Sequence, residues 1–503
     1  PVAARAAAAA AAQGRRGPAS DGSWTPPREV YSEMLRALPG SKMADRKVKH
    51  IGNPVLRKKA KMVKPERVTN QNSTDVVGEL LRAIRGPQML GRRQKGGALA
   101  APQLGTPSRL VVFEDPAEEV SDLSQEEREL QGRTEAFGPK AIFNPRVRPT
   151  TDRTAVLWER NPSLPGYRAL VERPVEVRVA GLDPEGGEVD YVAKGWEARL
   201  AQQAVDVLDG VLFTDRCIMR SLRHLDAQDD PLPLDCPAVG PKGLPQQALS
   251  EEELAAVAAR GGSRGFLPGF GRPNTLLVGS VLLRLRAQEV PAADVTSSEV
   301  ADTIRELREA VDSGAHPLGI AAPQLGRRLR IIAVGEKAEA IEKLDARTRV
   351  MEEHTAFGPL VVLNPVIRRR AGSLDAYFFE RSASVPGYEG VVGRPAEVDV
   401  EGLDERGRPL SITARGWKAR MLQHAADVLD GVLYVDRMDR RSFRRDKLQF
   451  ELPDGVPFGV RPAAKKPAAK KPAAKQPAQR ARAPGAKRPA AGAPRARTAR
   501  SRR

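Results

Sequence analysis

Cysteine is scarce in this chain: its 503 residues include two, Cys217 and Cys236, and no CxxC pair. That count excludes a disulfide framework and a cysteine-rich zinc module, and it is typical of a reducing compartment. Aromatic residues are also few, at 4% of the chain. No run of eighteen apolar residues occurs, which excludes a membrane-spanning helix, so we expect no membrane partner.

Acidic residues are absent from residues 462–503, which carry fourteen Lys or Arg and repeat the pentapeptide AAKKP. This segment therefore holds +14 of the formal net charge of +19. Regular proline and like-charge repulsion predict that it is disordered in isolation. Such a segment binds polyanions through counterion release, but it has no aromatic side chain to stack on a base and read a sequence. A purely solubilising tail is the alternative.

The first 46 residues form a second extension. Residues 1–23 are rich in Ala and Arg and contain one acid, Asp21. This composition resembles an organellar transit segment. A low-complexity extension with no targeting role fits the same composition.

Between the extensions lies an internal duplication with a constant offset of 220 or 221 residues. The matching segments are APQLG at 101–105 and 322–326, AFGP at 136–139 and 356–359, PGY at 165–167 and 386–388, and DVLDGVL at 206–212 and 427–433. Two long diverged copies predict tandem globular domains rather than a solenoid, over 47–225 and 272–452. Residues 226–271 then form a linker, in which SEEEL at 250–254 has the capping-box pattern of a short helix. A basic disordered tail occupies 453–503.

Each copy combines strands with one strong helix, so the fold class is α+β. RLVVF at 109–113 and LRIIAV at 329–334 have the apolar character of buried strands, and Val175, Val177 and Val179 alternate with charged residues. GWEARLAQQAVDVLDG at 195–210 and GWKARMLQHAADVLDG at 416–431 have apolar residues at helical spacing, which predicts a helix that buries one face. We expect the VLF and VLY segments that follow to resume a strand.

These landmarks together resemble the peptide deformylase family, particularly its organellar members. GGALAAPQ at 96–103 and PLGIAAPQ at 317–324 are similar to the family motif G-Φ-G-Φ-A-A-x-Q, and GNPVLR at 52–57 and, more weakly, GSVLLR at 279–284 are similar to the family's opening. The resemblance implies two tandem domains, each with strands around a central, formerly metal-binding helix. It also implies an activity, because the family removes the formyl group from the initiator methionine of new organellar and bacterial proteins.

The resemblance assigns a role to five positions of copy one. The family holds its metal through the thiolate of E-G-C-x-S and the two imidazoles of H-E-x-x-H, whose Glu serves as acid and base. In copy one the motif glutamine is Gln103, but Asn161 stands at the thiolate position. Gln203 and Val207 stand at the two imidazole positions and Ala204 at the Glu position.

The same positions in copy two are Gln324, Ser382, His424, Ala425 and Val428. His424 is the only retained ligand-type residue of either copy. A single imidazole does not hold a catalytic ion that normally takes three protein ligands. We therefore interpret both sites as catalytically degenerate, with no metal site and no cofactor expected.

Charged residues next to these positions receive structural interpretations. Glu159 and Glu380 are expected to hold neighbouring backbone, because a buried carboxylate must find donors. Asp206 and Asp427 are expected to bond locally within the fold. Arg160, like its copy-two counterpart, replaces the glycine of the motif and would bring positive charge to the old cleft.

The favoured hypothesis is a soluble, non-catalytic protein of the mitochondrion or plastid that binds the organellar ribosome or its rRNA through residues 462–503. Peptide N-termini are a further candidate partner. The main alternative is an active peptide deformylase that holds Fe, Zn or Ni through other ligands. A third hypothesis is a nuclear DNA-binding protein, since the tail is similar in composition to linker-histone tails.

Overall fold

The structure is a computed structural model, and it describes Trp24 and residues 47–86, 97–233, 235–241, 275–314, 316–446, 448 and 450–461. The chain divides into two compact units, 1–463 and 464–503, and the described residues belong to the first. The expected transit segment, the expected helix at 250–254 and the expected basic tail at 462–503 lie outside the described residues. No helix within the described ranges combines the length and the apolar character that a membrane crossing requires.

Copy one contains short and long helices and nine strands in its described residues. The helices are η1 (Pro54–Arg57), α3 (Pro65–Val68), α4 (Gln71–Arg85), η2 (Ala101–Leu104), α5 (Ala117–Ser121), α6 (Gln125–Gln131), α7 (Gly195–Leu208), α8 (Phe213–Arg216), η3 (Met219–Ser221) and η4 (Leu225–Ala227). The strands are β1 (Gly97–Ala100), β2 (Leu110–Asp115), β3 (Phe137–Pro149), β4 (Thr154–Glu159), β5 (Tyr167–Pro174), β6 (Glu176–Leu182), β7 (Glu188–Lys194), β8 (Arg223–His224) and β9 (Gly240–Pro241).

Copy two repeats this order. Its helices are η5 (Val281–Arg284), η6 (Ala292–Asp294), α10 (Ser298–Asp312), η7 (Ala322–Leu325), α11 (Ala338–Glu342), α12 (Ala346–Met351), α13 (Gly416–Leu429), α14 (Tyr434–Arg437) and η8 (Arg440–Ser442). Its strands are β10 (Ile320–Ala321), β11 (Ile331–Glu336), β12 (Phe357–Arg369), β13 (Asp375–Ser382), β14 (Val385–Pro395), β15 (Glu397–Leu403), β16 (Pro409–Arg415), β17 (Arg444–Arg445) and β18 (Gly459–Arg461).

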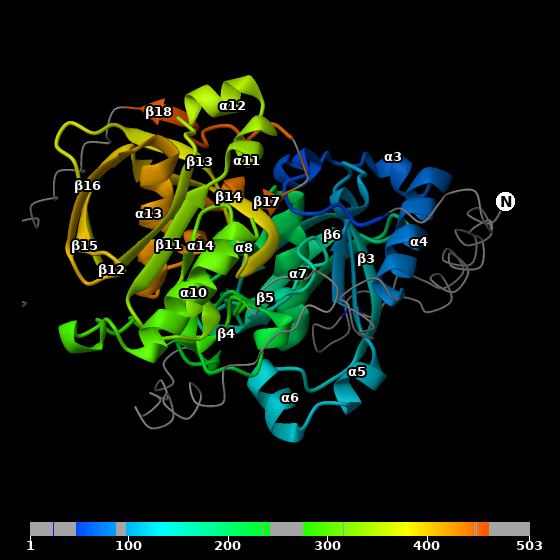
Figure 1. Cartoon of the computed structure of the whole chain (residues 1–503). Coiled ribbons are helices and arrows are strands. Elements are labelled where there is room, and N and C mark those ends of the chain that lie inside the picture. Colours follow the sequence, from blue (N-terminus) through cyan, green and yellow to red (C-terminus); the bar gives the residue numbers. More distant parts are fainter. Residues whose placement is uncertain are drawn as a thin grey trace, which may run out of the picture. The chain divides into compact units, whose positions relative to one another are not determined.

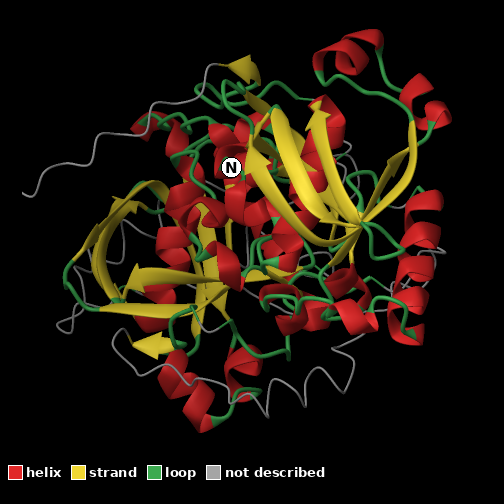
Figure 2. Ribbon diagram, turned by 60° about the vertical axis from the view of Figure 1, so that its left-hand side comes forward, coloured by secondary structure: helices red, strands yellow, loops and turns green. Residues whose placement is uncertain are grey.

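Each copy builds one five-stranded and one four-stranded antiparallel sheet. The orders are β1-β2-β3-β6-β7 and β8-β5-β4-β9 in copy one, and β10-β11-β12-β15-β16 and β17-β14-β13-β18 in copy two. The long helix of each copy packs against both sheets, and Figure 1 shows α13 inside the curve of β12, β15 and β16. Figure 2 shows the curved sheets and the helices around them. The α+β prediction is confirmed, and the sheets continue past residues 225 and 452 through β9 and β18.

The predicted helix of each copy is present, but it buries more than one face. Nine of the fourteen residues of α7 are buried, including the polar side chains Arg199 and Gln203. The reason is that a sheet covers the helix on two sides, so a single stripe of apolar residues does not describe its surroundings. The helix starts at Gly195, whose φ is 53° and where a Cβ would lie 2.1 Å from the carbonyl oxygen of Gly132. Only glycine fits that start.

The prediction of a strand after each long helix is wrong, because the chain forms the short helices α8 and α14 there. The backbone N–H of Leu212 donates to the Asp215 carboxylate at 2.8 Å, and the N–H of Asp215 donates back to the carbonyl of Leu212 at 2.9 Å. Leu433 and Asp436 repeat the first of these bonds at 2.8 Å. This reciprocal capping stabilises a helical turn, and it outweighs the β propensity of the preceding apolar residues.

The two copies contact each other through equivalent residues. The N–H of His224 donates to the carbonyl of Val278 at 2.7 Å, and the N–H of Arg445 donates to that of Ile51 at 3.2 Å. The rings of Tyr167 and its counterpart Tyr388 meet edge to face, with their centroids 5.3 Å apart. Buried apolar residues of both copies belong to one core cluster. These reciprocal pairings are those of a two-fold interface formed within one chain.

Candidate functional site

The motif glutamine of each copy lies at the short helix after the first strand, where its amide has three partners. Gln103 accepts the N–H of Ala100 at 3.0 Å and donates from Nε2 to Asn161 Oδ1 at 3.1 Å and to Ser163 Oγ at 3.2 Å. All three side chains of this group are buried. The glutamine therefore ties the β1 end to the segment after β4.

Copy two repeats the arrangement with a hydroxyl in place of the amide. Gln324 accepts the N–H of Ala321 at 3.0 Å and donates from Nε2 to Ser382 Oγ at 3.3 Å and Ser384 Oγ at 3.1 Å. The N–H of Ser384 also donates to Ser382 Oγ at 3.3 Å. The thiolate position of each copy thus holds a neutral oxygen that already accepts two hydrogen bonds, since Asn161 Oδ1 likewise accepts the N–H of Ser163 at 2.9 Å.

In each copy, the residue at the first imidazole position of the long helix contacts the glutamate of the thiolate motif. Gln203 on α7 donates from Nε2 to Glu159 Oε2 at 3.2 Å and to the carbonyl of Arg160 at 2.9 Å. His424 on α13 pairs through Nδ1 with Glu380 Oε2 at 2.9 Å. The structure therefore brings the first helix position of each copy to the carboxylate that begins the old thiolate motif.

The remaining helix positions belong to the core. Ala204, Val207, Ala425 and Val428 are all buried members of the same apolar cluster. A methyl or isopropyl group there packs against its neighbours and offers no donor to a ligand.

Glu159 holds arginine side chains, so the expectation that it holds backbone is wrong. Arg173 donates to both carboxylate oxygens, at 2.6 and 3.0 Å, and Arg199 donates to Oε1 at 2.6 Å. Burial raises the pKa of this carboxyl, but the two guanidinium groups outweigh burial and hold the pKa below its ordinary value. The two guanidinium groups supply positive charge that neutral backbone N–H groups lack, and this charge offsets the cost of burying the carboxylate. Asp206 binds Arg173 at 2.7 Å, which is the local bonding expected of it.

Copy two contains the same network with one exchange of side chain. Arg394 donates to both oxygens of Glu380, at 2.5 and 2.8 Å, and Arg420 donates to Oε1 at 2.6 Å. His424 occupies the place that Gln203 has in copy one. Burial again raises the pKa of Glu380, but Arg394, His424 and Arg420 lower it well below the ordinary range. Asp427 completes the network through Arg394 at 2.7 Å.

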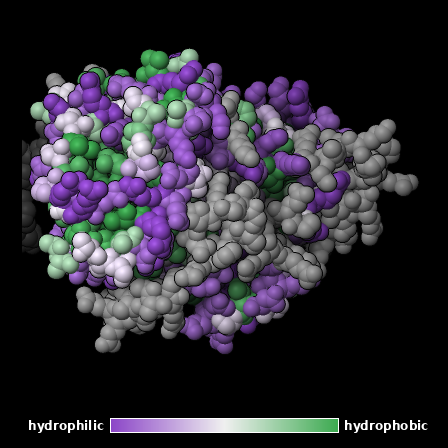
Figure 3. Space-filling model, viewed as in Figure 1, coloured by the Kyte–Doolittle hydropathy of each residue, from purple (hydrophilic) through white to green (hydrophobic). Residues whose placement is uncertain are grey.

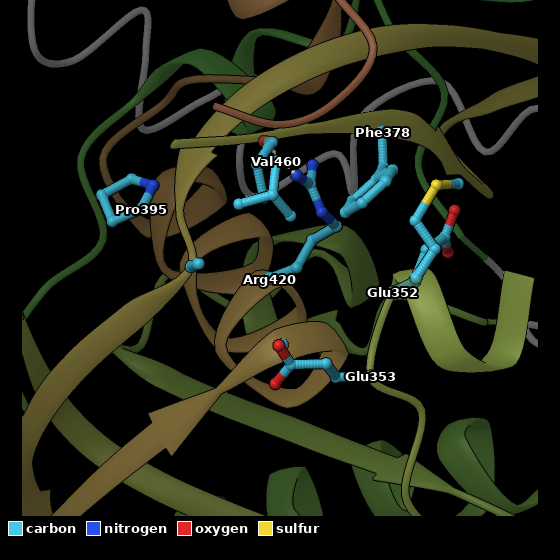
Figure 4. A pocket seen from close by; sticks show the side chains of 10 residues that line it. Glu352, Glu353, Phe378, Pro395, Arg420 and Val460 are labelled. Atoms are coloured by element: carbon cyan, nitrogen blue, oxygen red, sulfur yellow. Dashed lines mark hydrogen bonds between the residues drawn. The ribbon is translucent and has the colours of Figure 1, made fainter. Parts of the chain in front are cut away.

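Sequence reasoning missed the four buried arginines of these networks. Arg199 and Arg420 are the Arg of the G-W-x-A-R motif, whose position on the buried helix was the available signal. The guanidinium of Arg420 lies between Phe378 and Val460 (Figure 4). The cavity beside it has a volume of about 10 Å³, which is room for a single water molecule. The expected cleft arginines differ between the copies, since Arg160 is half-buried and Arg381 is exposed.

The donors present do not fit a catalytic divalent metal. Such an ion takes three protein ligands, usually imidazole, thiolate or carboxylate. The positions of the family's thiolate, imidazoles and Glu hold amides and aliphatic groups in copy one. In copy two they hold a hydroxyl, one imidazole and aliphatic groups. Within the described residues, no group of three or more His, Cys, Asp or Glu side chains is arranged to hold a metal ion. Cys217 and Cys236 are buried elsewhere, and burial raises the pKa of their thiols to about 12 and about 11.

Comparison with known proteins identifies the family. The family model described as Polypeptide deformylase matches residues 45–223 and 274–444. Peptide deformylase 1A, chloroplastic, of Solanum lycopersicum is 31% identical over 271 residues, 52% of this chain and 96% of that protein. Peptide deformylase 1A, chloroplastic/mitochondrial, of Arabidopsis thaliana is 35% identical over 191 residues, 38% of this chain and 68% of that protein.

Among solved structures, the K3U-bound class I type b peptide deformylase from Acinetobacter baumannii is 26% identical. The match covers 34% of this chain and all of that chain, with a TM-score of 0.29. The two matched segments of the family model coincide with the two copies of the duplication. The chain therefore belongs to the peptide deformylase family, as a tandem pair of family domains.

Proposed function

We propose that both clefts are catalytically degenerate and that the protein acts as a non-catalytic, ribosome- or RNA-associated member of the family in an organelle. The observation that carries this proposal is the donor set. Asn161 and Ser382 stand where a thiolate is needed, and each already accepts two hydrogen bonds from its neighbours. An oxygen whose lone pairs already accept two hydrogen bonds within the fold is a poor ligand for a cation.

The proton-transfer group is missing as well. Ala204 and Ala425 occupy the position of the acid and base, and a positioned general acid or base contributes a factor of roughly 10²–10⁴ to rate. In copy one the residue after the thiolate position is Pro162, which has no N–H to stabilise an oxyanion. Three independent elements of the hydrolytic chemistry are therefore replaced in copy one.

The binding role is supported by charge and by the relatives. Residues 462–503 carry fourteen cations and no carboxylate, which suits RNA phosphates through counterion release. The two plant relatives bear names that place them in the chloroplast or the mitochondrion. A mitochondrial or plastid ribosome, or its rRNA, is the partner that fits both observations.

Metal analysis of the purified chain, together with turnover of a formyl-methionyl peptide, tests the degenerate clefts. We expect less than stoichiometric iron, nickel or zinc and no deformylation. A matched positive control is the copy-two triple variant Ser382→Cys, Ala425→Glu and Val428→His, which restores the family's donors around His424. Stoichiometric metal with deformylation in the unmodified chain would overturn the proposal in favour of an active deformylase.

Co-sedimentation with organellar ribosomes at low salt tests the binding role. We expect the full chain to sediment with ribosomes and a chain lacking residues 462–503 to do so more weakly. If the full chain stays in the supernatant, or if the shortened chain sediments equally well, ribosome association through this segment is wrong.

A further inference from the structure

Copy one carries a row of exposed cations that copy two lacks. The row lies between η1 and α4 and consists of Lys58, Lys59, Lys61, Lys64 and Arg67, all exposed. Within the described part of the chain none of these five side chains forms an ion pair. One carboxylate, that of Glu66, lies among them in sequence. We call residues 58–67 the basic segment.

The backbone of the basic segment is anchored on both sides, so its side chains have a set direction. The N–H of Ala60 donates to the carbonyl of Leu208 at 2.7 Å, and the N–H of Lys61 donates to that of Pro107 at 2.7 Å. Asn144, which has a φ of 52° at a bulge in β3, holds both the N–H and the carbonyl of Val63, at 2.8 and 2.7 Å. Ala60 points into the core while the lysines on either side of it are exposed.

Copy two builds the same backbone without the charge. Ala287 donates to the carbonyl of Leu429 at 2.7 Å, and Asn364 holds the N–H and the carbonyl of Val290, both at 2.9 Å. The equivalent residues 285–294 contain one cation, Arg286, and two carboxylates, those of Glu289 and Asp294. The fold therefore does not require these lysines, because the same hydrogen bonds form in copy two without them.

We infer that the basic segment is a binding surface for the phosphate backbone of RNA, on the folded part of copy one and separate from residues 462–503. This inference rests on the proposed RNA-associated function and assigns part of that function to a defined surface. Unpaired lysines bind phosphates as point charges, and a row of them along an extended chain suits a backbone of regularly spaced anions. Lys59 and Lys61 are alternate residues of the stretch before α3, and alternate residues of an extended chain stand roughly 7 Å apart.

The surroundings favour RNA over a membrane or a protein. Figure 3 shows hydrophilic side chains at the surface near α3, and Met62 is the large apolar side chain exposed among the lysines, at 57%. A single exposed methionine provides little apolar area for membrane insertion or for an anchor in a protein partner. The segment contains no aromatic side chain, so we expect binding that does not depend on base sequence.

The test measures binding of the full chain to a labelled single-stranded RNA by fluorescence anisotropy between about 50 and 200 mM salt. The test variant replaces Lys58, Lys59, Lys61 and Lys64 with Gln. Its charge-matched control replaces four exposed cations of copy two with Gln: Lys337, Lys343, Arg347 and Arg406. Both variants should melt within a few degrees of the unmodified chain, because exposed substitutions change stability by about 0.5 kcal/mol or less.

We expect the slope of log K against log salt to become shallower by about 3 in the test variant, since each phosphate contact on a single strand contributes about 0.7. The control should keep the slope of the unmodified chain. Equal slopes in the test and control variants would overturn the inference while leaving the proposed function intact. If the unmodified full chain does not bind RNA in a salt-dependent way, the proposed function itself fails.

A second arm uses vesicles of phosphatidylcholine and phosphatidylserine. We expect the full chain and the test variant to differ on RNA far more than on vesicles. If the test variant loses vesicle binding and retains RNA binding, the basic segment is a membrane-facing surface and the inference is wrong.

Discussion

The substitution Glu380→Gln tests the buried charge network around Glu380 in copy two. Glu380 is completely buried and accepts four charge-assisted contacts, from Arg394 at 2.5 and 2.8 Å, Arg420 at 2.6 Å and His424 at 2.9 Å. Glutamine has the same shape but no charge, and its amide nitrogen would face a guanidinium. The variant therefore leaves Arg420, whose side chain is 3% exposed, without its counterion, and it leaves Arg394, whose side chain is 4% exposed, with Asp427 alone.

Removing one partner of a buried ion pair typically costs about 3–5 kcal/mol, because the other charge stays buried and unbalanced. We expect a loss in this range in the free energy of unfolding, measured by urea denaturation followed by far-UV circular dichroism. The matched control is Asp190→Asn, which breaks the Arg178–Asp190 pair on the surface, whose side chains are 62% and 48% exposed. An exposed pair contributes about 0.2–1 kcal/mol. If Glu380→Gln costs no more than Asp190→Asn, the network does not stabilise the fold as argued.

The same variant makes a pH prediction with a definite sign. The folded state holds the pKa of Glu380 well below its ordinary value, because Arg394, His424 and Arg420 together outweigh the raising effect of burial. The stability that this carboxylate contributes is therefore complete above its unfolded pKa, about 4.3, and is lost as the pH falls toward the folded value. The difference in unfolding free energy between the unmodified chain and Glu380→Gln should shrink as the pH falls below about 4.3. A difference that stays constant into strong acid would contradict this assignment.

Three further outcomes follow from the structure. Burial lowers the pKa of His354, but Glu336 and Glu352 outweigh it and raise the pKa to about 9, so the urea midpoint should fall as the pH rises from about 6.5 through 9, and His354→Arg should remove that dependence. Gly52→Ala should cost more than about 1 kcal/mol by thermal denaturation, because Gly52 has a φ of 99° and the new Cβ would lie 2.4 Å from the Cβ of Arg444 in the other copy. Treatment with a chelator should leave the melting temperature of the unmodified chain unchanged, whereas loss of a structural or catalytic metal would lower it.

The elements that local pattern determines were predictable from the sequence. The runs predicted as strands at 109–113 and 329–334 lie mostly in β2 (Leu110–Asp115) and β11 (Ile331–Glu336), and the two G-W-x-A-R segments are helices. Continuous apolar character and helical spacing act over a few residues, so these elements could be predicted. The partners of Glu159 were not predictable in this way, since Arg173 and Arg199 lie 14 and 40 residues away along the chain. Strand pairing and the packing of the helix bring these residues together in space. A single sequence does not reveal which buried arginine meets which carboxylate.

The contacts between the two copies could not be predicted from local sequence patterns either. Tyr167 donates its hydroxyl to the carbonyl of Pro386, 219 residues away, at 3.1 Å. The duplication itself was visible as repeated segments, but repetition alone does not show that equivalent residues of the copies face one another. That property depends on both domain surfaces together, and each surface is assembled from several elements of one copy.

Several of the positions that the family uses for its metal belong to the apolar core of this chain. Val207 and Val428 stand at imidazole positions and pack into the shared core, so these replacements add buried apolar area where a metal ligand would otherwise stand. The arginines that hold Glu159 and Glu380 come from β5, β14 and the long helices, and none of them stands at a ligand position. Each copy also buries residues against the other, as Tyr167 and Tyr388 do. The arginine networks and the contacts between the copies would therefore maintain both domains under the proposed loss of hydrolysis, while the surface of copy one carries a row of cations that copy two lacks.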